Sequence, residues 1–269
     1  MKIGVFDSGF GGLTVLRSLL SIVPQADYLY LGDSARLPYG SKSPQTVAHY
    51  AASSAKFLHT KGIELLVIAC NSASAVALDA IRSAVPIPVI GVIEPGATTA
   101  ANLSRTRRVC VIGTQATIAS HAYSNALQTH GLEVKEKACP LLVPLVEEGW
   151  TDHPVTEQVA RIYLQELFSE CEASWIDGVA ADTLVLGCTH YPLLKPLLSR
   201  ILPEDMQMVD SADAVAHQVA LVADLNQRFK VSAGSCSFFA TDSLEKFRTL
   251  GARFLGQEIA AVELVTLPE

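Results

Sequence analysis

The sequence lacks the features that mark membrane, secreted and disordered chains. Its apolar residues come in short runs, none near the roughly 20 consecutive residues that cross a bilayer. The start, MKIGVFDSGFGG, has one brief apolar stretch followed by glycines, so no secretory signal is expected. Of the 269 residues, 17% are charged and 49% hydrophobic. This composition excludes a disordered chain and favours one large or two medium-sized globular domains.

Positive charge is also scarce. There are 20 Lys and Arg residues against 27 Asp and Glu, a net charge of −7, and the largest basic cluster is RTRR at 105–108. Such a surface repels the phosphate backbone of nucleic acids, so no nucleic-acid partner is expected. An anionic ligand must be held by local dipoles and hydrogen bonds instead.

The six cysteines form no C-x-x-C pair and show no repeated spacing. We therefore expect reduced thiols in a cytoplasmic protein. Cys110 and Cys236 lie inside apolar runs typical of strands, and the default interpretation of a free cysteine is a small core residue. The cysteines that need a second interpretation are those at the ends of such runs, Cys70 and Cys188.

Short apolar runs alternate with segments of helical length. A helix is predicted over 43–62, with Ser43 as its N-cap, Pro44 at its first position and Gly62 as its stop. Apolar strands alternating with helices predict an α/β fold whose mainly parallel sheets are covered on both faces. Ligands of such sheets bind beyond the carboxyl ends of the strands. Strands are expected at 2–7, 27–33, 64–70, 87–93, 108–114, 183–188 and 236–242.

Two pairs of segments resemble each other. LLVIACNSASA (65–75) and TLVLGCTHYPL (183–193) each give an apolar run, a small residue, a cysteine and two polar residues. IGVFDSGFGG (3–12) and VCVIGTQAT (109–117) each give a strand, a turn and a hydroxyl residue. These echoes predict two similar doubly wound parallel-sheet domains, with the active site in the cleft between them.

The predicted division makes the first domain discontinuous. Residues 1–95 plus 209–269 are expected to form it and to carry Asp7 and Cys70. Residues 96–208 are expected to form the second domain, which carries Thr114 and Cys188. The C-terminal segment needs a sheet to join, and the first domain offers the simplest one.

Cys70 and Cys188 are each predicted to follow a strand and precede a helix. The positive end of a helix can lower a thiol pKa from about 8.5 towards about 3.5–7.5, which makes thiolate available at neutral pH while the thiol form remains a competent acid. Two such thiols in facing domains suggest a base and an acid on opposite sides of one carbon. Removing a proton from one face and returning it to the other inverts a stereocentre, with no redox change and no leaving group.

Other interpretations of the same residues stay open at this point. Both thiols fit a structural role, a zinc site with His190 and Asp7, a nucleophile with His190 as its base, or a redox pair. Against the zinc site, Cys-x-His is tight for metal ligands, and against the redox pair, C-x-x-C is absent. The glycines of DSGFGG (7–12) suggest a phosphate loop, but neither G-x-G-x-x-G nor G-x-x-x-x-G-K-[ST] occurs.

Seven segments in order, from residue 6 to residue 194, carry a family resemblance. The chain resembles the glutamate racemases of the aspartate/glutamate racemase superfamily. One departure is Ser72, where the family commonly has Thr, and the hydroxyl is retained. The segments are FDSGFGG, LYLGDSARLPYG, ACNSASA, GVIEPG, VIGTQAT, ACPLLVPLVEEG and LGCTHYPLL.

The resemblance implies interconversion of L- and D-glutamate without cofactor or metal, to supply D-glutamate for peptidoglycan. It implies acid/base roles for Cys70 and Cys188, assisted by Asp7 and His190, with Glu147 as a further acidic residue of the site. Asp33 is a weaker acidic candidate. The implied substrate-binding residues are Asp7, Ser8, Tyr39, Gly40, Asn71, Ser72, Thr114, Thr189 and His190.

The expected partner is the small-molecule substrate glutamate, with neither nucleic acid nor membrane, and a homodimer is left open. An aspartate- or hydantoin-type racemase and a non-catalytic binding protein for an acidic amino acid remain alternatives. Turnover of glutamate against aspartate discriminates among them.

Overall fold

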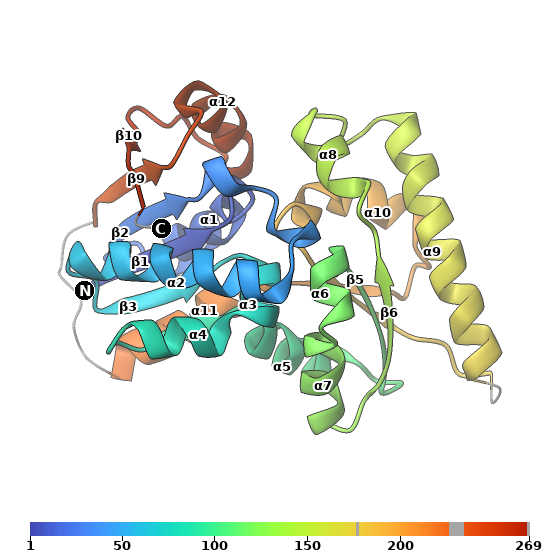
Figure 1. The fold of residues 1–269 in the computed structure, drawn as a ribbon. Helices are drawn as coiled ribbons and strands as arrows, with labels where there is room; N and C mark the ends of the chain where they lie inside the picture. Colours follow the sequence, from blue (N-terminus) through green and yellow to red (C-terminus); the bar gives the residue numbers. More distant parts are fainter. Residues whose placement is uncertain (176–177, 226–233, 268–269) are drawn as a thin grey trace.

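Two all-parallel sheets form the framework of the protein (Figure 1). The computed structural model describes residues 1–175, 178–225 and 234–267. The first sheet has the strand order β10-β9-β2-β1-β3-β4 and the second β6-β5-β7-β8. The strands are β1 (Lys2–Asp7), β2 (Asp27–Gly32), β3 (Leu65–Ile68), β4 (Val89–Gly91), β5 (Arg108–Gly113), β6 (Glu133–Ala138), β7 (Thr183–Gly187), β8 (Gln207–Asp210), β9 (Cys236–Ala240) and β10 (Glu263–Leu264).

Helices connect the strands and cover the sheets. The α-helices are α1 (Leu13–Ile22), α2 (Pro44–Thr60), α3 (Asn71–Val76), α4 (Leu78–Ala84), α5 (Ile93–Leu103), α6 (Gln115–Ala119), α7 (Ala122–Thr129), α8 (Leu142–Glu147), α9 (Pro154–Ser174), α10 (Lys195–Ile201), α11 (Ser211–Leu225) and α12 (Leu244–Leu255). Short 3₁₀ helices are η1 (Ser34–Arg36), η2 (Tyr39–Ser41) and η3 (Tyr191–Leu194).

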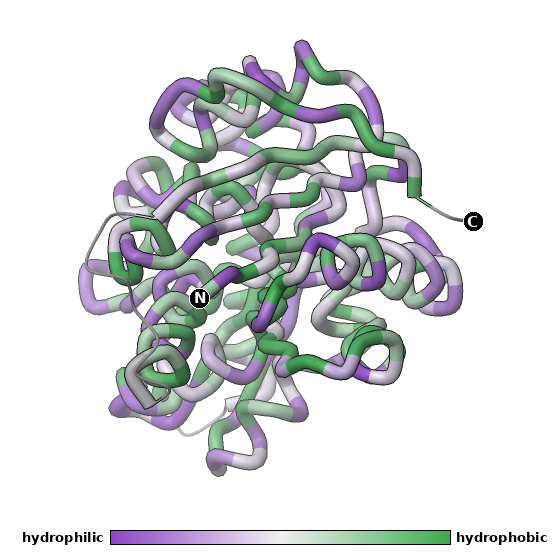
Figure 2. The backbone as a smooth tube through the Cα atoms, turned by 90° about the vertical axis from the view of Figure 1, so that its left-hand side faces the viewer, coloured by the Kyte–Doolittle hydropathy of each residue, from purple (hydrophilic) through white to green (hydrophobic). Residues whose placement is uncertain are grey.

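Both faces of the first sheet are buried. Ile3 and Val5 of β1 share one hydrophobic cluster with Leu16 of α1, whereas Phe6 shares another with Ala51 of α2. Alternate residues of a strand point to opposite faces, so a strand covered on both sides must be apolar throughout. Figure 2 shows hydrophobic and hydrophilic residues alternating along the helices, as expected where one helix face packs on a sheet and the other meets solvent.

The second sheet is covered in the same way. Cys110 of β5 lies in a cluster with Leu167 of α9, and Val111, its neighbour on the same strand, clusters with Ala97 of α5 and Leu127 of α7. The prediction of two doubly wound parallel-sheet units is therefore confirmed.

All seven predicted strands are present, and the predicted helix at 43–62 is α2, whose N-cap Ser43 accepts from the Thr46 amide at 3.3 Å. Gly62 ends that helix region with a φ of +80°. Three strands were not predicted. β6 is the edge strand EVKEKA, which carries alternating charges, β8 has four residues, and β10 has two exposed ones. None presents the apolar run by which buried strands are detected.

The C-terminal segment returns to the first sheet, where β9 pairs with β2 and β10 pairs with β9. Its red ribbon therefore lies beside the blue N-terminal strands (Figure 1). The division of the chain at 95/96 and 208/209 stays a prediction. Its second boundary falls inside β8, and its ranges include 176–177, 226–233 and 268–269, which lie outside the described residues.

Within the described ranges, none of the helices has the length and apolar character needed to span a membrane.

Candidate active site

A cavity of about 160 Å³ lies between the two sheets, at the carboxyl ends of β1, β3, β5 and β7. Strands from both sheets thus deliver their following residues to one space. Of the residues implied by the resemblance, ten line this cavity, whereas Asp7 and Glu147 are not among its lining residues. The ten are Ser8, Tyr39, Gly40, Cys70, Asn71, Ser72, Thr114, Cys188, Thr189 and His190.

Cys70 follows β3 and is the N-cap residue of α3. Its Sγ accepts a hydrogen bond from the Ala73 amide at 3.4 Å, and its thiol donates to Ser8 Oγ at 3.6 Å. Burial and the negative charge of Asp7 raise the pKa of the Cys70 thiol to about 12, and the hydrogen bonds from Ala73 and Ser8 offset this only in part. The prediction that the helix start would lower this thiol's pKa is therefore wrong. Cys70 therefore carries its proton at neutral pH.

Asp7 is the last residue of β1 and is 1% exposed. Its Oδ2 accepts from the Gly9 amide at 2.9 Å, while Oδ1 has no hydrogen-bond partner among the described residues. Burial raises the pKa of Asp7, and the nearby charge of His190 lowers it to a lesser extent. Asp7 is thus a buried carboxyl group able to hold a proton close to Cys70.

Cys188 follows β7 in the second sheet. The next helical turn, η3, begins at Tyr191, after the two polar residues Thr189 and His190. The Tyr191 hydroxyl donates to the carbonyls of Gly113 at 3.1 Å and Cys139 at 2.9 Å. These bonds fix the loop, and in it the Cys188 Sγ lies 3.9 Å from His190 Nδ1.

His190 connects this thiol to an acidic residue. Its Nε2 lies 3.2 Å from Glu147 Oε1, and its ring meets the Phe254 ring edge-on with centroids 5.0 Å apart. Burial alone would lower the pKa of His190, but the hydrogen bonds and charges of Cys188 and Glu147 outweigh burial and raise it to about 10. The imidazole is therefore protonated at neutral pH.

Glu147 is the last residue of α8 and does not contact the cavity directly. Burial acts to raise its pKa, but the hydrogen bond and charge of His190 and the charge of Lys246 lower it overall. Lys246 Nζ, on α12, lies 3.5 Å from Glu147 Oε2. A chain of polar contacts thus runs from Cys188 through His190 and Glu147 to an exposed lysine.

Hydroxyl groups from the two halves meet across the cleft. Ser72 Oγ lies 2.9 Å from Thr114 Oγ1, which in turn lies 2.9 Å from Thr117 Oγ1. Gly40 packs directly against Thr114, because a Cβ at position 40 would lie 2.9 Å from the Thr114 Cβ. The cleft is narrow here and lined by groups that both donate and accept hydrogen bonds.

The glycines after β1 serve close packing. A Cβ on Gly11 would overlap the Thr189 hydroxyl, and one on Gly12 would lie 2.5 Å from the Asp7 Cβ. These contacts account for two glycines of DSGFGG without a phosphate. In the described part of the chain, no cluster of three or more His, Cys, Asp or Glu side chains is arranged to hold a metal ion.

Two predicted residues have side chains that are already engaged. Asn71 Oδ1 accepts from the Tyr123 hydroxyl at 2.7 Å, and its Nδ2 donates to Ser211 Oγ at 3.3 Å. The Tyr39 hydroxyl donates to Asp33 Oδ2 at 2.5 Å. Asp33 does not line the cavity, so its carboxylate holds the loop that carries Tyr39.

Six further residues line the cavity and were not predicted. Gln115 follows the predicted Thr114 directly, and three others lie within the segment ACPLLVPLVEEG (138–149), quoted above for the resemblance. Apolar wall residues of this kind carry no polar signal in the sequence. The six are Pro38, Ser41, Gln115, Pro140, Val143 and Pro144.

Comparison with known proteins places these features in one family. The family model of the Asp/Glu/Hydantoin racemases matches residues 3–219. A glutamate racemase from Koribacter versatilis is 52% identical, over 98% of this chain and 97% of that protein. The crystal structure of glutamate racemase from Francisella tularensis in complex with D-glutamate has a TM-score of 0.87 at 38% identity, covering 98% of this chain and 97% of the other. A glutamate racemase isoform from Bacillus anthracis has a TM-score of 0.90 at 36% identity, covering 99% and 97%.

Proposed function

Because the chain belongs to the Asp/Glu/Hydantoin racemase family, we propose that it is a cofactor-independent glutamate racemase in which Cys70 and Cys188 exchange the α-proton from opposite faces. One observation carries this proposal. The two thiols come from the carboxyl ends of strands in different sheets and line the same cavity. Its volume of about 160 Å³ is below the ~300–1,000 Å³ of pockets for drug-sized ligands, which suits an amino acid.

The two thiols have opposite electrostatic surroundings. Burial, with a smaller contribution from Asp7, keeps Cys70 protonated, whereas His190, with its raised pKa of about 10, places a positive charge 3.9 Å from the Cys188 sulfur. We therefore assign Cys188, which lies beside this positive charge, as the base and Cys70 as the acid.

In the direction for which Cys188 is the base, its sulfur removes the α-proton and the Cys70 thiol delivers its own proton to the opposite face of the α-carbon. The configuration at the α-carbon is inverted, and the two cysteines have exchanged protonation states. To reset the pair, Asp7 gives a proton to Cys70 and regains one from solvent, while Cys188 releases its proton to solvent and His190 keeps its positive charge beside that sulfur. The opposite enantiomer is converted by the same groups with acid and base reversed.

The carbanion formed between these steps requires stabilisation by its surroundings. Enzymes take ~8–23 kcal/mol off such barriers, whereas general acid–base transfer contributes ~10²–10⁴-fold in rate. Fixed hydrogen-bond donors around the carboxylate must supply most of the remainder. Ser8, Ser72, Thr114 and Thr189 present hydroxyl groups to the cavity and are the residues we assign to this task, with Asn71, Tyr39 and Gly40 shaping its wall.

The proposed product, D-glutamate, serves peptidoglycan synthesis, and we propose a cytoplasmic location. All six cysteines are free thiols, the form that a reducing cytoplasm maintains. A homodimer stays a prediction, and sedimentation equilibrium of the full chain tests it.

Circular dichroism of L- and D-glutamate, followed without added cofactor, tests the activity. Racemisation is expected with both enantiomers of glutamate and not with aspartate. Cys70→Ala and Cys188→Ala should each lose at least ~10²-fold in kcat while remaining folded, because each lacks one proton-transfer group. Cys236→Ala, a cysteine of β9 outside the cavity, is the matched control. Full turnover in either active-site variant would remove the two-thiol mechanism, and turnover of aspartate would reassign the substrate.

Deuterium incorporation tests the order of proton transfer. In D₂O, the two-thiol mechanism should place deuterium in the product enantiomer, with little label in recovered substrate at early times. With a single base serving both faces, deuterium would instead appear in the recovered substrate as fast as the product forms.

A further inference from the structure

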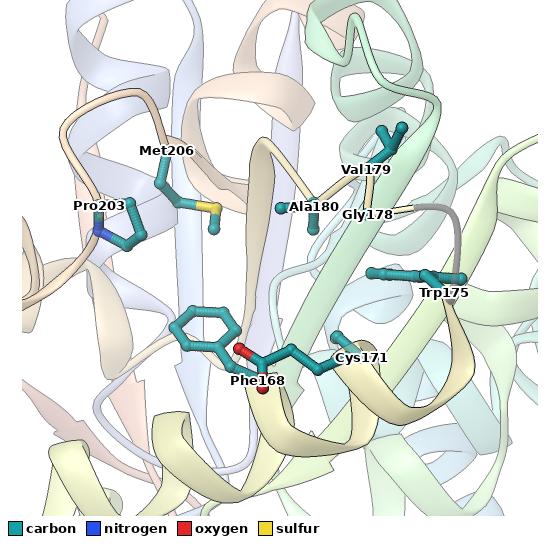
Figure 3. Close-up of a pocket in the computed structure, with 10 residues that line it drawn as sticks. Phe168, Cys171, Trp175, Gly178, Val179, Ala180, Pro203 and Met206 are labelled. Carbon is teal, nitrogen blue, oxygen red and sulfur yellow. The ribbon is translucent and has the colours of Figure 1, made fainter.

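A second cavity lies in the half of the molecule built on the second sheet, away from the cleft. It has a volume of about 480 Å³ and lies between the end of α9, residues 178–181 and the loop that precedes β8 (Figure 3). Phe168, Trp175 and Met206 contribute large apolar surfaces to its wall. The wall also contains one thiol, that of Cys171.

Cys171 has a second thiol directly behind it. Its Sγ lies 3.5 Å from the Sγ of Cys110, which is on β5 beneath α9. Cys110 is completely buried and Cys171 is 6% exposed. Only Cys171 lines the cavity, so a small molecule in the cavity meets this thiol first and Cys110 stands behind it.

The surroundings of the pair favour thiolate at the outer position. The hydrogen bond between the two sulfurs lowers the pKa of Cys171, burial opposes this, and the charge of Lys135 on the neighbouring strand β6 adds to the lowering. The nearby carboxylates of Glu170 and Glu172 act in the opposite direction and do not reverse it. The same hydrogen bond, together with burial, raises the pKa of Cys110.

We propose that Cys171 and Cys110 are a peroxide-reactive thiol pair, in which Cys171 is the attacking sulfur and Cys110 the resolving one. Reactive cysteines combine thiolate character, a route for the oxidant and an adjacent second thiol. The cavity supplies the route. A water molecule occupies about 30 Å³ and hydrogen peroxide the space of a few water molecules, so the cavity of about 480 Å³ is large enough to admit it. The proposal is independent of the racemase chemistry, because neither sulfur lines the cleft.

The reaction proceeds in two balanced steps. The Cys171 thiolate attacks one oxygen of hydrogen peroxide, the O–O bond breaks, and Cys171 becomes a sulfenic acid while hydroxide leaves. The Cys110 sulfur then attacks the Cys171 sulfur, the S–O bond breaks, and the thiol proton of Cys110 leaves with the hydroxyl group as water. Two thiols lose two electrons in total, and one peroxide is reduced to the oxidation level of water.

The geometry requires little movement for the second step. The sulfurs must approach from 3.5 Å to the ~2.05 Å of a disulfide bond. The product would join α9 to the strand on which it packs. Reduction by a thiol such as dithiothreitol would restore both cysteines.

Peptide mapping of the full-length protein tests the proposal. The chain is exposed to hydrogen peroxide with glutamate present to occupy the cleft, and free thiols are then blocked before digestion. Trypsin leaves Cys171 and Cys188 in one peptide, so a second cleavage after glutamate, at Glu172, is needed to separate them. The expected product is a peptide containing Cys110 linked to one containing Cys171, lacking two hydrogen atoms and released by dithiothreitol.

Two variants assign the roles of the sulfurs. In Cys171→Ser, Cys110 should remain a free thiol under the same exposure. In Cys110→Ser, Cys171 should still react but should stop at sulfenic acid or proceed to sulfinic acid. Unreacted Cys110 in oxidised wild-type protein, or oxidation of Cys110 in Cys171→Ser at the wild-type rate, would overturn the proposal. The wild-type map decides the question even where a variant fails to fold.

Discussion

Replacement of Glu147 by glutamine should lower the pKa of His190 and move the alkaline limit of activity to lower pH. In the wild-type protein, Glu147 Oε1 lies 3.2 Å from His190 Nε2, and the pKa of the imidazole is about 10. The substitution keeps the shape of the side chain and an oxygen that accepts a hydrogen bond, but it removes the negative charge. Activity should then be lost at a lower pH, because His190 loses the positive charge that it places 3.9 Å from the Cys188 sulfur.

The expected shift follows from the strength of this contact. A hydrogen bond to a charged group contributes ~1.5–3 kcal/mol, and one pKa unit corresponds to 1.36 kcal/mol. Because the amide oxygen of the introduced glutamine would retain part of the hydrogen bond, we take the lower end of that range, about one unit. The alkaline limb of kcat/KM should therefore move from near pH 10 to about pH 9.

The same shift has a consequence for stability. A histidine whose pKa is higher in the folded than in the unfolded state stabilises the fold most below pH ~6.5, and this contribution is lost as pH rises through the folded pKa. Here the loss runs from about pH 6.5 to about 10. Glu147→Gln should therefore be less stable than wild type near pH 6, by ~1–2 kcal/mol, and the difference should vanish towards pH 10.

The assays are a pH profile of racemisation by circular dichroism, an NMR titration of the His190 ring, and urea unfolding at pH 6 and pH 10. Glu148→Gln is the matched control, because its side chain is the next in sequence and is exposed. An unchanged alkaline limb and an unchanged ring titration in Glu147→Gln would refute the assigned coupling of Glu147 to His190. A shift of equal size in Glu148→Gln would attribute the effect to general surface charge.

Two further predictions follow from close contacts. Gly11→Ala should reduce kcat by ~10²-fold through misplaced catalytic groups, because its Cβ would overlap the Thr189 hydroxyl. Gly9→Ala is the control and should lose much less, because its Cβ would make ordinary contacts. Equal losses in the two variants would show that the loop tolerates no alanine at all. Tyr39→Phe should lower the free energy of unfolding by ~1–3 kcal/mol, since the buried Asp33 carboxylate loses a donor; urea denaturation measures this, and an unchanged midpoint would show that Asp33 finds another partner.

The framework was predictable because it depends on patterns along the chain. Strands buried on both faces must be apolar throughout, so apolar runs such as 64–70 can be recognised as strands. Because ligands bind beyond the carboxyl ends of parallel strands, the residues that follow each run are the candidates for the site. This reasoning led to Cys70 and Cys188, which do line one cavity. The edge strand β6, EVKEKA, has one exposed and five partly buried residues, so it carries no such pattern and was missed.

What was not predictable depends on contacts between distant segments. A cysteine at a helix start indicates a lowered thiol pKa, but burial and the charge of Asp7, brought beside Cys70 by pairing of β1 with β3, reverse that sign. The Tyr39 hydroxyl is committed to Asp33, and the pairing of Cys110 with Cys171 joins a strand to a helix far along the chain. Neither contact leaves a mark in local sequence.

The contact between Lys246 and Glu147 couples the width of the cleft to the pKa of His190. Lys246 lies on α12, which packs on α1 beside the first sheet, whereas Glu147 ends α8 in the other half. Any widening of the cleft separates this pair and leaves the whole charge of Glu147 to His190. The imidazole then binds its proton more tightly, and narrowing the cleft weakens that hold.

The effect is small, since a half-exposed ion pair contributes ~0–1 kcal/mol, which is less than one pKa unit. It is also reciprocal, because two coupled equilibria must influence each other equally. A proton on His190 therefore favours the wider cleft to the same small extent. The pH of the medium and the width of the cleft are therefore coupled through Lys246, a residue that does not line the substrate cavity.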